Sequence, residues 1–237
     1  MNIIVTGASR GIGYEVARKF ALDKDNTVLV ISRNEKKLKE LEKQCLSENP
    51  ECRLILLPFD LENIDGIEAE LRQQISGYFD SLDVLVNNAG LLIKEPIMKL
   101  DPSDAQRMMT VNFIVPLVLI RSLMPLLELG NSPHVVNIGS MAGVQGGKKF
   151  PGLSAYSASK AAVHILTECL AAEFTESSVR FNSLALGAVQ TDMLEEAFPG
   201  IKTPLEASEM ADFVKDFATN GQRYFNGKTL PVALSTP

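Results

Sequence analysis

Seven short runs rich in Val, Ile and Leu recur along the chain, and segments with helical character separate them. Strands that alternate with helices in this way form a parallel sheet covered by helices on both faces. No Pro-, Gly- or Ser-rich linker and no repeat divides residues 1–237. We therefore expect one doubly wound α/β domain whose mostly parallel sheet has about seven strands. The expected strands lie at 1–5, 27–32, 53–60, 82–90, 134–140, 179–187 and 228–234.

The longest apolar segment starts at Phe113 and is best explained as a buried helix. Pro116, Arg121 and Pro125 interrupt the segment, which is too short to span a bilayer. We expect this helix over about 102–128 and further helices over about 154–174 and 206–219.

Charge and cysteine content narrow the choice of partners and compartment. The net charge is −6 and the pI is near 5.1, whereas nucleic acid or an anionic membrane would favour a basic face. The three cysteines form no CxxC pair, which is typical of reduced thiols rather than of a disulfide framework or a zinc site. The expected first strand starts at Asn2 and so occupies the positions in which a signal peptide would have its charged start and apolar run. We expect a cytoplasmic protein with no metal, membrane or nucleic-acid partner.

The stretch TGASRGIG, residues 6–13, stands where the first strand gives way to a helix. Gly7, Gly11 and Gly13 lack the Cβ atoms that would obstruct a tight turn, a bound ligand or close packing of the helix on the sheet. The start of a helix offers free N–H groups, so a phosphate is a natural ligand there. Taken alone, the stretch is also compatible with an ordinary strand-to-helix turn.

Tyr156 and Lys160 are four residues apart on the helix expected from Ser154, so they face the same way. An ammonium beside a phenol stabilises the phenolate, and we expect it to lower the pKa of Tyr156. Such a tyrosine can exchange a proton with a carbonyl or alcohol oxygen. Ser140 ends a neighbouring strand and could hydrogen-bond the same oxygen. The pair is also compatible with a plain helix surface, and the serine with a cap.

These motifs together resemble the short-chain dehydrogenase/reductases over essentially the whole chain. The matching pieces, in order, are TGASRGIG (6–13), FDL (59–61), NNAG (87–90), TVNF with Asn112, NIGS with Ser140, YSASK (156–160) and GAVQTDM (187–193). The resemblance implies a Rossmann-type fold and a nicotinamide-dependent oxidoreductase. It also implies that Tyr156 is the acid/base, that Lys160 orients the ribose and assists Tyr156, and that Ser140 positions the substrate oxygen. Asn112 would hold a proton-relay water near Lys160, and a buried Asn that satisfies backbone groups is compatible with that role.

The resemblance further implies that Asp60 meets the adenine, that Asn88 meets the adenosine ribose, and that Val189 and Thr191 face the nicotinamide amide and the diphosphate. The full expected cofactor set is Gly7, Ser9, Arg10, Gly11, Ile12, Gly13, Ser32, Arg33, Asp60, Leu61, Asn88, Ala89, Gly90, Tyr156, Lys160, Val189 and Thr191.

The end of the second strand indicates which nicotinamide cofactor is used. An acidic residue at that point accepts from the ribose hydroxyls in NAD-binding relatives, but here the strand ends in Ser32 and Arg33. Arg33 together with Arg10 could bind a 2′-phosphate through charge-assisted hydrogen bonds. The sequence therefore favours NADP(H) over NAD(H).

Four departures from the family pattern concern the substrate side and the assembly. The run VQGGKKFPG lengthens the loop between Ser140 and Tyr156, and the usual Pro-Gly after the sixth strand is Leu186-Gly187. Few residues remain for a substrate lid, which we expect over about 192–220, so the pocket should be open. The chain also lacks the terminal Asp-Gly-Gly of many relatives, so a homodimer and a homotetramer both remain possible.

We predict reduction of a small-molecule ketone or aldehyde by NADPH. The alternatives are a 3-oxoacyl-(acyl-carrier-protein) reductase and a catalytically silent nucleotide-binding relative. The sequence does not name the substrate.

Overall fold

Seven strands form one parallel sheet in the order β3-β2-β1-β4-β5-β6-β7 in the computed structural model, which describes residues 1–234. Strand order reverses between β1 and β4, and the carboxyl ends of all strands meet along one edge of the sheet. The parallel doubly wound fold expected from the sequence is therefore confirmed. The strands are β1 Asn2–Thr6, β2 Thr27–Ser32, β3 Arg53–Pro58, β4 Val84–Asn87, β5 His134–Ser140, β6 Arg180–Leu186 and β7 Lys228–Val232.

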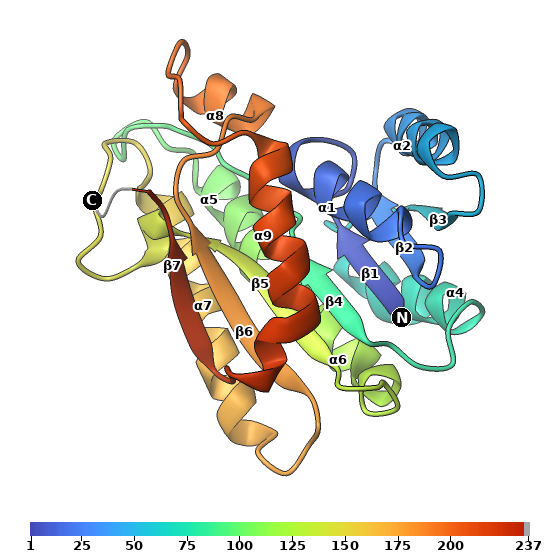
Figure 1. Ribbon diagram of the computed structural model, residues 1–237. Helices are drawn as coiled ribbons and strands as arrows, with labels where there is room; N and C mark the ends of the chain where they lie inside the picture. The colour runs from blue at the N-terminus through green and yellow to red at the C-terminus, as the bar shows by residue number, and fades with distance from the viewer. Residues whose placement is uncertain (235–237) are drawn as a thin grey trace.

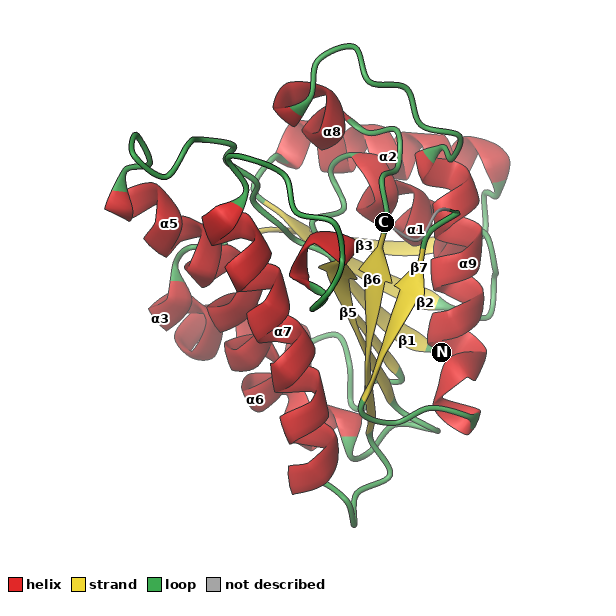
Figure 2. Cartoon of the chain, turned by 90° about the vertical axis from the view of Figure 1, so that its left-hand side faces the viewer, coloured by secondary structure: helices red, strands yellow, loops and turns green. Residues whose placement is uncertain are grey.

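Helices cover both faces of the sheet (Figure 2). One face carries α1 Gly11–Ala21, α2 Glu35–Glu48 and α9 Ala207–Asn220. The other face carries α3 Ile64–Gly66, a π-helical turn Ile67–Leu71, α4 Arg72–Ser76, α5 Pro102–Met109, a second π-helical turn Thr110–Ile114, α6 Val115–Leu127 and α7 Ser154–Glu173. Short 3₁₀ turns occupy Met141–Gly143 and Gly221–Arg223, and α8 Asp192–Ala197 lies above the strand ends (Figure 1).

Two apolar layers fill the space between the sheet and its helices. Val16, Phe20 and Val214 are fully buried in one layer, and Leu123 and Phe181 are fully buried in the other. The helix Pro102–Leu127 has the length and hydropathy of a membrane span, but most of that stretch is buried in the protein. It is a core helix, as its interrupted sequence predicts.

The segment expected as a lid divides into two parts with different environments. α8 and Phe198 face the cavity described below. α9 instead packs on α1, with Met210, Ala211 and Val214 buried. The expectation of a lid over about 192–220 is therefore corrected for its second part, because the apolar face of α9 belongs to the core.

Candidate active site

A cavity of about 380 Å³ lies over the carboxyl ends of the strands, where the strand order reverses. Its wall brings together residues that are far apart in the sequence, and Gly13 and Asn112 lie behind that wall. The expected site residues that line it are Gly7, Ser9, Arg10, Gly11, Ile12, Ser32, Arg33, Asp60, Leu61, Asn88, Ala89, Gly90, Ser140, Tyr156, Lys160, Val189 and Thr191.

The glycine loop forms one wall of the cavity, and its three glycines have different roles. Gly7 and Gly11 have φ of +69° and +60°, which disfavours other residues. A Cβ at Gly13 would lie 2.2 Å from Asn88 Nδ2, whereas a Cβ at Gly11 would meet only the Thr191 side chain, at 3.4 Å. No side chain caps α1, so its first N–H groups remain available at the cavity. The loop therefore fits the phosphate groups of a dinucleotide.

The turn after β4 is tied to the glycine loop by the side chain of Asn88. Its Nδ2 donates to the carbonyl oxygens of Thr6 and Gly7 at 3.0 and 3.2 Å. The side chain of Asn88 thus holds two loops together, and the residue itself lines the cavity. Asn87 Nδ2 donates to Asn137 Oδ1 at 2.8 Å and links β4 to β5 beneath the site.

Tyr156 and Lys160 project from the first two turns of α7 and are 8% and 5% exposed. Lys160 Nζ donates to the carbonyl of Ile138 at 2.8 Å, and burial lowers the pKa of Lys160 to about 8. Burial raises the pKa of Tyr156, and a hydrogen bond with Ser140 opposes that shift only in part. The expectation that Lys160 lowers the tyrosine pKa is wrong for this state, because the ammonium lies 6.0 Å from the ring centroid and binds a carbonyl.

Asn112 lies in the π-helical turn between α5 and α6 and is 1% exposed. Its Oδ1 accepts from Leu91 N at 2.8 Å, and its Nδ2 donates to Leu91 O at 2.8 Å and to Ser159 Oγ at 2.9 Å. The side chain therefore satisfies backbone groups, which is compatible with the role expected of Asn112. By fixing Leu91, Asn112 fixes the loop that continues from Gly90 along the cavity wall.

His164 supports the backbone of Ser140 and was missed by the sequence reasoning. Its Nε2 lies 3.1 Å from Ser140 O, and its Nδ1 lies 2.8 Å from Ser183 Oγ. A carbonyl can only accept, so Nε2 carries the proton, and burial lowers the pKa of His164 and keeps the ring neutral. A Cβ at Gly139 would lie 2.0 Å from the ring, so that glycine makes room for the histidine. Tyr156, Lys160 and His164 are spaced four residues apart and so share one face of α7, which was the available signal in the sequence.

Both arginines expected at the cofactor phosphate lie at the cavity and have carboxylate partners. Arg33 Nη1 lies 3.0 Å from Glu62 Oε1 and 3.9 Å from Asp60 Oδ1. Arg10 pairs with Glu196 and Asp192 of α8, which raises the pKa of its guanidinium. The glycine loop is thereby connected to α8.

The cavity is apolar around Tyr156. Tyr156, Met108 and Leu153 form a buried cluster, and Phe198 and Leu92 pack against it. Within residues 1–234, no three His, Cys, Asp or Glu side chains are placed to hold a metal ion.

Comparisons with known proteins place the chain in a family. Residues 1–202 match the family model for short chain dehydrogenase. An uncharacterized oxidoreductase of Staphylococcus saprophyticus is 31% identical over 209 residues, which cover 88% of this chain and 87% of that protein.

Two solved structures share both the fold and part of the sequence. A short chain dehydrogenase of Escherichia coli CFT073, complexed with NADPH, superposes with a TM-score of 0.86 at 29% identity, covering 97% of this chain and 95% of that one. A Shigella flexneri 2a short chain dehydrogenase, complexed with NADP, gives the same TM-score, identity and coverage. The chain therefore belongs to the short-chain dehydrogenase family.

Proposed function

We propose that this protein is an NADPH-dependent reductase of small ketones or aldehydes. The observation that carries the proposal is that Ser140, Tyr156 and Lys160 line the same cavity as the glycine loop. When bound, the nicotinamide cofactor supplies the hydride. Tyr156 carries the proton that the carbonyl oxygen takes, Ser140 orients that oxygen, and Lys160 supports Tyr156.

The residues at the adenosine end support NADP(H) rather than NAD(H). Arg33 directly follows β2, at the position where NAD-binding relatives have an acidic residue that accepts from the ribose hydroxyls. Arg10 lines the same cavity. Two solved relatives hold NADP or NADPH. In this proposal Arg33 and Arg10 exchange their carboxylate partners for the 2′-phosphate.

The test of this function follows NADPH fluorescence with a panel of aldehydes and diketones. Substrate-dependent decay in the wild type that Tyr156→Phe abolishes supports the proposal. NADPH binding without decay on any carbonyl compound would identify a catalytically silent relative.

We expect free carbonyl compounds to be better substrates than carrier-linked ones. Acyl carrier protein is acidic, and a chain with a net charge of −6 repels it. The run Leu170-Ala171-Ala172-Glu173 also lacks the Arg that carrier-dependent relatives commonly place there. The measurement compares kcat/KM for a carrier-linked 3-oxoacyl substrate and its small thioester analogue. A tenfold preference for the carrier-linked form that fades with added salt would favour the alternative, 3-oxoacyl-(acyl-carrier-protein) reductase.

We expect at least a dimer, formed through the outer faces of α6 and α7. Ile165 on α7 is 57% exposed although its helix is apolar on most sides. Light scattering at micromolar concentration should give the mass of two or four chains. Ile165→Asp should shift the protein toward monomer, whereas Leu46→Asp on α2 should not. A wild-type monomer contradicts this assignment.

A further inference from the structure

Four side chains form what we call the aromatic–lysine rim at the substrate side of the cavity: Lys94, Lys148, Phe150 and Phe198. Phe150 lies in the lengthened loop before α7, and Phe198 follows α8. Their rings meet edge to face with centroids 5.7 Å apart, and both line the cavity that contains Tyr156. Two segments that depart from the family pattern, the lengthened loop and the short segment expected as a lid, therefore meet at these rings.

An ammonium group lies against each ring of the rim. Lys94 Nζ is 3.9 Å from the centroid of Phe198, and Lys148 Nζ is 5.3 Å from the centroid of Phe150. Such cation–π contacts favour lysine conformations in which the ammonium stays beside the ring instead of extending into solvent. The rim therefore presents two positive charges next to apolar surface.

Neither ammonium is neutralised within the described part of the chain. Lys94 Nζ donates to Ala197 O at 3.0 Å, and no carboxylate lies within 4.0 Å of Lys94 or Lys148. The carboxylates of α8 make their contacts away from both lysines, since Asp192 and Glu196 lie against Arg10 of the glycine loop and Glu195 accepts from Gly200 N at 2.9 Å. A mouth with uncompensated positive charge in a chain of net charge −6 attracts small anions.

Apolar side chains line the cavity together with Phe150, Phe198 and Tyr156, and the two lysines of the rim lie against the rings without lining the wall themselves. Leu92, Leu153 and Met193 contribute to this wall. A ligand that places a carbonyl oxygen at Tyr156 and Ser140 thus meets hydrocarbon surface first and positive charge at the mouth. A neutral carbonyl compound would leave that charge without a partner.

We propose that the rim selects carbonyl compounds that carry an anionic group, carboxylate or phosphate, separated from the carbonyl by an apolar segment. This inference rests on the proposed reductase function and names its substrate class. It is compatible with rejection of acyl carrier protein, because a small anion interacts with the rim alone whereas a large acidic protein is also repelled by the net charge of −6 of the chain.

The experiment measures kcat/KM with NADPH for an oxo-carboxylic acid of medium chain length and for its methyl ester. A phosphate-bearing ketone of similar length forms a second anionic arm and distinguishes the two anions. We expect the wild type to prefer the acid by about tenfold, mainly through KM, since each partly exposed ion pair contributes up to about fivefold. The preference should decrease with added salt.

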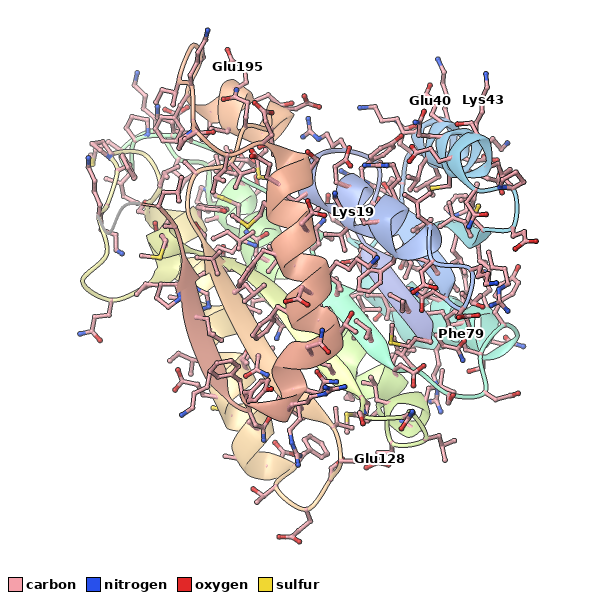
Figure 3. All side chains as sticks on the ribbon, in the orientation of Figure 1. Lys19, Glu40, Lys43, Phe79, Glu128 and Glu195 are labelled. Atoms are coloured by element: carbon pink, nitrogen blue, oxygen red, sulfur yellow. The ribbon has the colours of Figure 1, made fainter. Side chains whose placement is uncertain are left out.

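Lys148→Gln and Lys94→Gln should each reduce the acid-to-ester preference, and the double variant should nearly abolish it. Lys43→Gln removes the same charge from α2, away from α8 (Figure 3) and on the opposite side from the loop before α7 (Figure 1), and should keep the preference. Thermal melting confirms that each variant is folded. Equal use of acid and ester by the wild type, or an equal effect of Lys43→Gln, overturns the inference while the reductase function stands. No NADPH oxidation with any of the substrates overturns both.

Discussion

Replacing Tyr156 by phenylalanine should lower the turnover of carbonyl reduction by about two to four orders of magnitude, because only the proton donor is removed. Burial raises the pKa of Tyr156, so the phenol stays protonated at neutral pH and holds the proton that the carbonyl oxygen requires. The ring has little exposed surface. The substitution removes only the hydroxyl oxygen and leaves the apolar packing of the ring with Met108 and Leu153 in place. The affinity for NADPH should therefore change little.

The measurement combines single-substrate kinetics with an NADPH titration. Tyr224→Phe is the matched control, because Tyr224 is 79% exposed, lies beyond α9 and is absent from the cavity wall. This control should keep the wild-type rate. Retention of more than a tenth of that rate by Tyr156→Phe would contradict the assignment of Tyr156 as the acid/base.

The strands could be predicted closely because each is a short apolar run bounded by turn residues. The expected runs 27–32 and 134–140 coincide with β2 and β5. α8 was not expected, since a helix of six residues shows almost no periodicity. α9 was expected as a helix but assigned to the lid, because its partner α1 is almost two hundred residues away in sequence.

The site was predictable where a motif places the backbone and less so where side chains choose among partners. Gly11 and Tyr156 lie at the cavity as expected. Nothing in the sequence indicates that the amide of Asn88 binds the glycine loop, and Lys160 binds a carbonyl rather than the phenol. His164 contacts Ser140 because α7 packs against β5 and β6, and the spacing of His164 from Tyr156 and Lys160 shows only that the three share a helix face.

Replacing Arg33 by aspartate should weaken NADPH binding by about ten- to a hundredfold and NADH binding little. The charge-assisted hydrogen bonds that Arg33 would make to the 2′-phosphate contribute about 1.5–3 kcal/mol, and the new carboxylate repels the phosphate while it can accept from a ribose hydroxyl. Asp60 and Glu62, the present partners of Arg33, would then add to the repulsion.

Titration of both cofactors against wild type and variant gives four dissociation constants, which show whether Arg33 determines the preference for NADPH over NADH. Arg53→Asp makes the same charge change at the start of β3, at the opposite end of the strand from the cavity, and should leave the NADPH-to-NADH ratio unaltered. An equal loss in that control would show that net charge rather than a local contact governs affinity. If the wild type already prefers NADH, the residues that end β2 do not form a 2′-phosphate site, and Arg33 is simply the partner of Glu62.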